Sequence, residues 1–480
     1  MKNLCALLLL LLIVPVVESA ERPNIVVILC DDLGWGDLQN YGHPHIKTPR
    51  LMELAEQGIQ FSNFYSAAPV CSPSRVGLLT GRMPNRAGVY DWIPDANPKS
   101  PVTRSRQLVE MRREEFTIPQ MLKAAGYATC MSGKWHCNAM FNSEKQAQPG
   151  DHGFDHWFAT QNNAAPSHEN PRNFVRNGEQ VGQLEGYSCQ IVADEAVSWL
   201  EQHHQDDSGQ PFFIYMAFHE PHEPVASPPE LVAKYKDVAR NVDEAHYFAN
   251  VENLDLAAGK LLDALDRLEV SENTLVVFTS DNGPETLNRY KNATRSYGTP
   301  GHLRGMKLHT HDAGFHVAGI MRWPAKFTGG TKCDVPVSSL DLLPTFAKLS
   351  GGQLPDDRIF DGTNILSVFE GNPVDRAQPL LWAYYNSYDG KTYLPTVAMR
   401  DGNMKVRAIV QGLPKTENID GTNVMALQNA VLGEFEIYDL STDPSELHPL
   451  PVEGSPLPAK LSRLHAELLK DCHIWPAVEK

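Results

Sequence analysis

The sequence predicts an α/β fold in which a large, mostly parallel sheet lies between helices, followed by a small antiparallel subdomain. Continuous apolar runs without polar alternation, such as residues 25–30, are typical of strands that are buried on both faces. Helical patterns separate these runs over about 350 residues, which is the order of elements in a sheet covered by helices. Beyond about residue 370 the apolar runs become short and turns separate them, which favours an antiparallel sheet.

The expected elements divide the chain into residues 21–370 and residues 371–480. In the first part we expect strands at residues 23–32, 128–131, 212–218, 274–279 and 317–321. The helices expected between them are residues 48–57, 117–125, 189–203 and 247–268. In the second part we expect strands at residues 380–385, 396–400, 404–409 and 435–440, and a last helix at residues 458–469.

Residues 1–20 have the features of a secretory signal peptide. Lys2 gives a positive start, an apolar run spans residues 4–17, and Ser19 and Ala20 are small residues at its end. A buried N-terminal helix is the alternative. The run is too short for a membrane-spanning helix, and no later stretch reaches that length. The mature protein is therefore expected to be exported and free of the membrane, either secreted or periplasmic, or lysosomal in a eukaryote.

Composition excludes several classes of protein. Of the 480 residues, 42% are hydrophobic and 21% are charged, which is typical of a globular chain and excludes collagen, coiled coil and general disorder. The formal net charge of -16 disfavours nucleic acid as a partner. Any anionic ligand therefore needs a local positive site. The eight cysteines show neither a compact disulfide framework nor the paired spacing of structural zinc.

Acidic and amide side chains follow two of the expected buried strands. Asp31 and Asp32 end the first, and Asp281 and Asn282 follow the strand at residues 274–279. Taken alone, the first pair is equally consistent with a polar loop, and Asn282 with Gly283 favours a hairpin turn. If the two strands are parallel neighbours, however, the four side chains converge at one edge of the sheet. Such oxygen ligands predict a calcium or magnesium site.

The segment Cys71-Ser72-Pro73-Ser74-Arg75 predicts the start of a helix. Ser72 is expected to cap it, and Pro73 suits its first turn. Cys71 then lies at the positive end of the helix, where anions bind. Arg75 lies one turn further along, and its guanidinium group suits a tetrahedral oxyanion.

These motifs resemble the type I sulfatases of the alkaline-phosphatase superfamily, in particular the branch of N-acetylgalactosamine-6-sulfatases and arylsulfatases. The resemblance covers nearly the whole mature chain. The matching segments are Cys-x-Pro-x-Arg at residues 71–75, Leu-Thr-Gly-Arg at residues 79–82, and residues 22–25, 31–34, 133–136, 221–224, 281–283, 304–307 and 438–446. One departure is Asp312-Ala313-Gly314, where the family usually has Glu-Gly-Gly.

The resemblance implies an alkaline-phosphatase-like sandwich with a mixed, mostly parallel sheet, and a catalytic domain at residues 21–370. It implies that a maturation enzyme oxidises Cys71 to formylglycine. The hydrate of formylglycine has two hydroxyls, of which one attacks sulfur and expels the alcohol, while the other is deprotonated and ejects sulfate. It also implies a calcium ion, held by Asp31, Asp32, Asp281, Asn282 and residue 71.

Roles for the remaining site residues also come from the resemblance. Arg75, Lys134 and His136 support the hydrate. Lys134, His222 and Lys307 bind the sulfate, and the last two assist the leaving oxygen. Because the match lies in Pro-His-x-Pro, His222 is favoured over His219. We expect His309, His311 and His316 to belong to a polar loop or to lie behind the site.

The predicted function is hydrolysis of sulfate esters, with a sulfated carbohydrate as substrate. One alternative is a phosphatase or phosphodiesterase of the same superfamily, although those enzymes use Thr or Ser as nucleophile. Another is a non-catalytic carbohydrate-binding relative in which Cys71 stays unmodified. Residues 161–177, which include Asn162, Asn163, His168 and Arg172, are either a substrate-facing loop or a surface connection.

Overall fold

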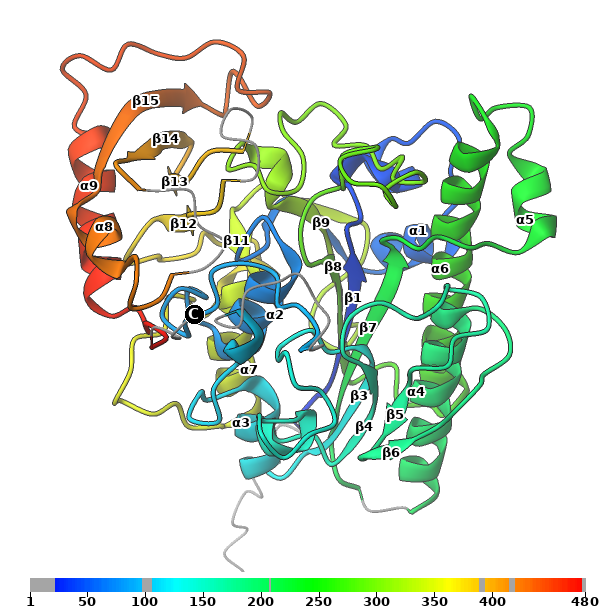
Figure 1. The fold of residues 1–480 in the computed structure, drawn as a ribbon. Coiled ribbons are helices and arrows are strands. Elements are labelled where there is room, and N and C mark those ends of the chain that lie inside the picture. Colours follow the sequence, from blue (N-terminus) through cyan, green and yellow to red (C-terminus); the bar gives the residue numbers. More distant parts are fainter. Residues whose placement is uncertain (1–21, 97–105, 207–208, 388–392, 414–418, 477–480) are drawn as a thin grey trace, which may run out of the picture.

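The computed structural model describes residues 22–96, 106–206, 209–387, 393–413 and 419–476, so the expected signal peptide at residues 1–20 lies outside the described residues. A large sheet forms the centre of the molecule and lies between two layers of helices (Figure 1). Its strands are β1 (Asn24–Asp31), β2 (Ile59–Tyr65), β3 (Ala128–Lys134), β4 (His156–Thr160), β5 (Val175–Arg176), β6 (Glu179–Gln180), β7 (Phe212–Pro221), β8 (Thr274–Ser280), β9 (His316–Arg322), β10 (Thr331–Cys333) and β11 (Val337–Ser338).

The strand order is β10-β2-β9-β8-β1-β7-β3-β4-β5-β6, with β11 also paired to β2. β1 is parallel to both β7 and β8, and β3 is parallel to β7 and β4. β9 is antiparallel to β8 and β2. The expected mixed, mostly parallel sheet is therefore confirmed. All five strands expected from the apolar runs are present, and the strand expected at residues 128–131 continues to Lys134.

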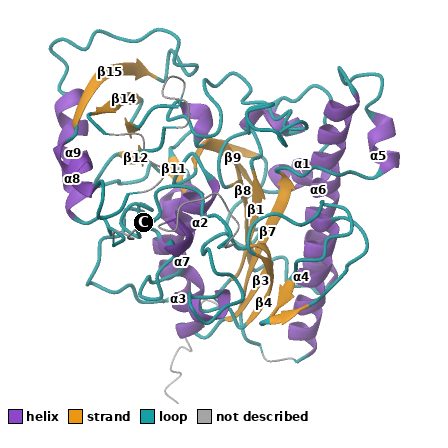
Figure 2. Ribbon diagram, viewed as in Figure 1, coloured by secondary structure: helices purple, strands orange, loops and turns teal. Residues whose placement is uncertain are grey.

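Each face of the sheet has its own apolar core and its own helices (Figure 2). The helices on one face are α2 (Cys71–Thr80), α3 (Ile118–Ala124) and α7 (Leu342–Ser350). The helices on the other are α1 (Pro49–Glu56), α4 (Ser188–Gln205), α5 (Pro229–Lys234) and α6 (Val242–Arg267). Alternate residues of β1 enter the two cores, with Val27 on one side and Val26 on the other, which explains why the strand is apolar throughout.

The start of α2 differs from the prediction in one respect. The helix begins at Cys71, and its N-cap is Val70, which has no side chain able to cap. The expected cap, Ser72, lies inside the first turn instead, and its Oγ accepts a hydrogen bond of 2.9 Å from the backbone N–H of Ile93. The capping prediction was wrong because a neighbouring loop uses this hydroxyl. The predicted position of Cys71 at the helix N-terminus is confirmed.

A second sheet follows, with the antiparallel order β12-β13-β14-β15. Its strands are β12 (Leu380–Tyr384), β13 (Thr396–Asp401), β14 (Met404–Gln411) and β15 (Val431–Asp439), the last of which begins earlier than expected. The helices of this part are α8 (Val424–Asn429) and α9 (Leu457–Lys470), and α9 packs on the sheet. The exact division at residues 370 and 371 stays a prediction.

Buried charges join the second sheet to the first. Lys405 Nζ lies 2.7 Å from Asp312 Oδ1 and 2.8 Å from Glu446 Oε1, and all three side chains are almost completely buried. Asp312 belongs to the segment that departs from the family pattern, and it also accepts hydrogen bonds from Tyr65 and His316. The departure therefore lies in the contact between the two sheets. No helix in the described ranges is long and apolar enough to cross a membrane.

Candidate active site

The acidic and amide side chains predicted to converge do so at the carboxyl ends of β1 and β8. The two strands are parallel neighbours, so their final residues meet at one edge of the sheet. Asn282 Nδ2 donates a hydrogen bond of 2.7 Å to Asp32 Oδ1, and the backbone N–H of Asp32 donates one of 3.2 Å to Asp281 Oδ1. Asp31 completes the group, and all four side chains are buried.

Three basic side chains surround these carboxylates. Arg75 approaches Asp281 Oδ2 at 2.9 Å through Nε. Lys134 Nζ lies 2.5 Å from Asp31 Oδ2, and Lys307 Nζ lies 2.7 Å from Asp32 Oδ1. Each base thus neighbours a different acid of the group. The acidic chain therefore carries the local positive cluster that an anionic ligand requires.

Burial and these charges set the pKa values of the group. Burial alone would raise the pKa of Asp31, but Lys134 and other nearby cations hold it well below its usual range. Burial and the charge of Asp31 raise the pKa of Asp281 to about 7. Burial opposes the charge on Lys307, yet Asp32 raises its pKa well above the usual value. The crowded carboxylates are therefore a site where further positive charge stabilises the ionised forms.

Cys71 lies directly beside this charged group. Only 3% of the residue is exposed, and its place at the first position of α2 puts it in the positive field of the helix N-terminus. Burial raises the pKa of its thiol to about 11, although Lys134 and Lys307 act in the opposite direction. At neutral pH the unmodified side chain is therefore a protonated thiol, which is a weak nucleophile.

The structure separates the candidate histidines. His222 lines the cavity, and its Nδ1 lies 2.6 Å from the carbonyl oxygen of Glu223, so Nδ1 is the nitrogen that donates. Its Nε2 lies 3.6 Å from Asp32 Oδ2, and burial lowers its pKa to about 3. His219 is instead fully buried, with Nε2 2.8 Å from Thr160 Oγ1. Of these two histidines, His222 lines the cavity and His219 does not.

His136 follows Lys134 and Trp135 directly after β3. Its backbone has a φ of +54°, a left-handed conformation that is uncommon for residues other than glycine. Its Nε2 lies 2.9 Å from the carbonyl oxygen of Ile93. The neighbouring Gly133 has no room for a side chain, since a Cβ atom there would lie 1.8 Å from the carbonyl oxygen of Ala217. The close approach of β3 to β7, just before Lys134 and His136, therefore requires this glycine.

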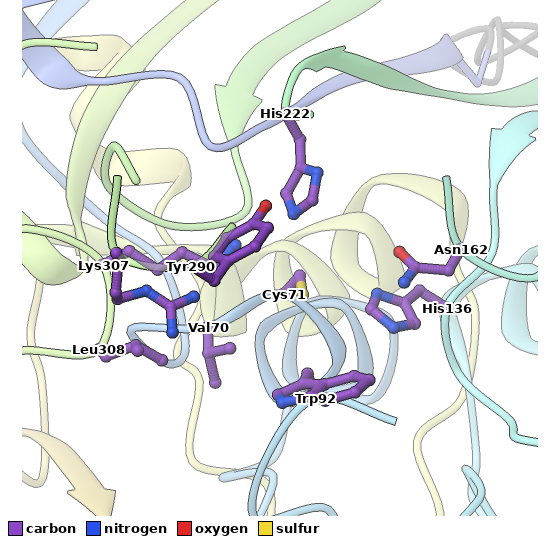
Figure 3. Close-up of a pocket in the computed structure, with 10 residues that line it drawn as sticks. Val70, Cys71, Trp92, His136, Asn162, His222, Tyr290, Lys307 and Leu308 are labelled. Atoms are coloured by element: carbon purple, nitrogen blue, oxygen red, sulfur yellow. The ribbon is translucent and has the colours of Figure 1, made fainter. Parts of the chain in front are cut away.

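A cavity of about 330 Å³ opens above Cys71. It is lined by Val70, Cys71, Trp92, His136, Asn162, His222, Arg289, Tyr290, Lys307 and Leu308. Figure 3 shows Cys71 at its centre, with Lys307 and Tyr290 on one side and His136 and Asn162 on the other. Trp92, Arg289 and Tyr290 were not among the predicted site residues. Trp92 lies in the loop after α2, and Arg289 and Tyr290 lie in the long loop between β8 and β9, several residues beyond the matching segment at residues 281–283. An aromatic or basic residue in such a loop is a weak sequence signal.

Residues 161–177 were expected to be either a substrate-facing loop or a surface connection, and only a small part of them reaches the cavity. Asn162 lines it. His168 is fully buried behind β7, with Nδ1 3.5 Å from Glu220 Oε1, so it does not face a substrate. Arg172 is exposed and lies outside the cavity lining. His309, His311 and His316 also lie outside the lining, and His316 bonds Asp312 at 2.9 Å.

The acidic group has the chemistry of a hard-cation site. Asp31, Asp32 and His222 offer ligand atoms that lie within 4.8 Å of one another. Asp31 Oδ1 and Asn282 Oδ1 are buried, and neither has a hydrogen-bond partner among the described residues. Buried oxygen atoms without a partner require an explanation, and a bound cation supplies one. Carboxylate and amide oxygens suit calcium or magnesium.

Comparison with known proteins agrees with this geometry. The family model described as Sulfatase matches residues 23–352. Human N-acetylgalactosamine-6-sulfatase is 32% identical over 93% of the chain and 85% of its own length. Human arylsulfatase A is 32% identical over 91% of the chain and 85% of its own length. The solved structure of Ps i-CgsB in complex with k-i-k-neocarrahexaose has a TM-score of 0.77 and 26% identity, and the match covers 94% of each chain.

Proposed function

The chain belongs to the sulfatase family and is a sulfuric ester hydrolase, and we propose that its substrate is a sulfated carbohydrate. The observation that carries the proposal is the position of Cys71, at the start of α2 and on the wall of a cavity lined with Lys307 and His222. Two of the similar proteins support the proposal that the substrate is a carbohydrate. One is named an N-acetylgalactosamine-6-sulfatase, and the other was solved with a neocarrahexaose.

We propose that residue 71 acts as formylglycine, made from Cys71 by a maturation enzyme. A thiol whose pKa is raised to about 11 is poorly suited to attack an anionic sulfate ester. The hydrated aldehyde would supply a hydroxyl nucleophile and a second hydroxyl for release of sulfate. Arg75 and Lys134 lie beside residue 71 in the charge network, and His136 lines the same cavity, so these three side chains are placed to orient it.

The sulfate group would lie among Lys134, His222 and Lys307. Lys307 remains protonated because Asp32 lies 2.7 Å from its Nζ, so its ammonium group can donate hydrogen bonds as charge develops on the leaving oxygen. His222 turns Nε2 toward the acidic group because Nδ1 is held by the Glu223 carbonyl. The ammonium groups of the two lysines suit a tetrahedral anion, whereas Nε2 of neutral His222 would donate to it only after gaining a proton.

We propose that Asp31, Asp32, Asp281, Asn282 and residue 71 hold one calcium ion, for which magnesium is the alternative. When bound, the ion would neutralise the crowded carboxylates and add positive charge next to the sulfate. The buried oxygen atoms without partners on Asp31 and Asn282 support this assignment. We also propose export through the signal peptide at residues 1–20, which is supported by the positive start, the apolar run and the small residues of that segment.

The test of the proposal is the mass of the peptide that carries residue 71, measured together with hydrolysis of sulfate and phosphate esters. We expect loss of the cysteine sulfur and gain of an aldehyde, with turnover of sulfate esters in the same preparation. Faster turnover of phosphate esters would favour a phosphatase. An intact thiol with carbohydrate binding and no turnover, in a host that matures other sulfatases, would favour the non-catalytic alternative.

A further inference from the structure

We propose that Trp92 is the platform for the pyranose ring of the substrate, and so determines which sulfate esters are bound well. This inference rests on the proposed function, because it assigns a residue to the carbohydrate part of the same substrate. Trp92 is half-buried and lines the cavity with Cys71 and His136. In Figure 3 its indole lies beneath Cys71, across the cavity from His222.

Arg106 covers one face of the indole. The guanidinium carbon of Arg106 lies 4.4 Å from the ring centroid of Trp92, which is a cation–π contact. Arg106 also donates a hydrogen bond to the carbonyl oxygen of Trp92 and lies 3.3 Å from Asp91 Oδ2. Arg106 and Asp91 are both buried, so this support is shielded from water. The ring is therefore held in one orientation before any ligand arrives.

The backbone on both sides of Trp92 is fixed as well. Asp91 accepts hydrogen bonds from Tyr384, at 3.1 Å, and from Asn386, which belong to the second part of the chain. On the other side, the N–H of Ile93 donates to Ser72 Oγ, and its carbonyl oxygen lies 2.9 Å from His136 Nε2. The position of the indole is thus tied to residues adjacent to the nucleophile on one side and to the small sheet on the other.

The chemistry of this wall differs from that of the sulfate site. An indole has no charge to offer a sulfate group, and the basic side chains already surround that position. A flat apolar face suits the C–H groups on one side of a pyranose ring, and binding sites combine such faces with a few polar groups. Asn162, which lines the same cavity, can hydrogen-bond to a sugar hydroxyl. A rigid aromatic side chain also loses little conformational freedom on binding.

The experiment compares Trp92→Phe, which keeps a flat ring, with Trp92→Leu, which keeps apolar bulk without one. The substrate is whichever the parent enzyme hydrolyses fastest among N-acetylgalactosamine 6-sulfate, galactose 6-sulfate and ι-carrageenan oligosaccharides. Inorganic sulfate serves as a competitive inhibitor without a ring, so its Ki reports the sulfate site alone. Trp199→Leu is the matched control, since Trp199 is a half-buried tryptophan on α4, stacked on His203 and outside the cavity lining.

For Trp92→Leu we expect KM for the sulfated sugar to rise about tenfold, with the Ki of sulfate unchanged within about twofold. Trp92→Phe should stay within about threefold of the parent in both quantities. Equal KM values for the Leu and Phe variants would overturn the proposal, and so would a parallel rise in the sulfate Ki, which would indicate a structural role. A parent enzyme that hydrolyses no sulfate ester would instead count against the proposed function.

Discussion

The floor and the rim of the cavity are built in different ways. On the floor, the side chains of the acidic group, its three basic neighbours and Cys71 are each at most about 4% exposed, and most follow a strand of the central sheet. On the rim, Trp92, Asn162 and Tyr290 are only half-buried and lie in loops. The acidic group and Lys134 lie at the ends of β1, β3 and β8, and Cys71 and Arg75 lie on α2. The rim positions come instead from contacts between distant segments.

The difference between floor and rim corresponds to two parts of the substrate, the sulfate group and the alcohol that carries it. A sulfate group is the same in every substrate, so the residues that bind it can be fixed by the sheet. The alcohol that carries the sulfate varies, and loops can change without disturbing the strand ends. We therefore expect changes on the floor to affect every sulfate ester, and changes on the rim to affect only some of them.

The largest expected effect is the loss of the floor's nucleophile. Cys71→Ala should lower turnover of every sulfate ester by at least about a thousandfold, because no other group on the floor can form the covalent intermediate. The circular dichroism spectrum should not change, since the helix does not depend on this side chain for its cap. Cys333→Ala, at a half-buried cysteine on β10, is the control and should keep full activity. Substantial turnover by Cys71→Ala would remove residue 71 from the mechanism.

The second largest effect is expected from removal of the proposed metal ion. Protein purified without chelator should contain about one calcium or magnesium ion per chain by elemental analysis. Chelation should abolish activity and lower the melting temperature, because the ion binds only the folded state. At free ion about 100-fold above its Kd, the stabilisation is about 2.7 kcal/mol. Added calcium should restore both quantities. Two zinc ions per chain, or a melting temperature that chelator leaves unchanged, would contradict the proposed site.

The sequence predicted the floor far better than the rim, and the reason is physical. Strand ends, paired acids and the Cys71 segment are local signals, and a parallel sheet brings them together. The orientation of Trp92 depends instead on Arg106 and on the contact between Asp91 and Tyr384, which lies far along the chain. Nothing near Trp92 in the sequence shows that contact.

Two further errors have similar causes. His168 lies in a segment rich in Asn and Pro, which suggested an exposed loop, yet the carboxylate of Glu220 on β7 holds it in the interior. β2 was not predicted because a register shift between Phe61 and Phe64 interrupts its alternation of buried and exposed residues. In both cases tertiary contacts override the local pattern.

A smaller effect, on stability rather than on activity, is expected from substitution of His168, a loop residue that is buried. His168→Ala removes a buried partner of Glu220, whose Oε1 also accepts from the N–H of Cys189 at 3.0 Å. We expect the free energy of unfolding to fall by about 1–3 kcal/mol, measured from the denaturant midpoint. The ratio of activities on a sulfated sugar and on a small aryl sulfate should not change. A selective loss on the sugar would place His168 on the rim after all.

The smallest effects compare two residues of that same loop, Asn162 on the cavity wall and Arg172 on the outer surface. Asn162→Ala removes an amide that can bond a sugar hydroxyl, so kcat/KM for the sulfated sugar should fall by a factor of about 2 to 10, corresponding to ~0.5–1.5 kcal/mol. Its activity on a small aryl sulfate should stay close to that of the parent.

Arg172→Ala should leave both activities unchanged, because the side chain is exposed and the hydrogen bond to Ala165 comes from the backbone N–H, which alanine keeps. Measuring both substrates with both variants locates the boundary of the rim within this loop. A loss for Arg172→Ala equal to that for Asn162→Ala would extend the rim to the outer surface, and the contrast between a fixed floor and a local rim would then fail.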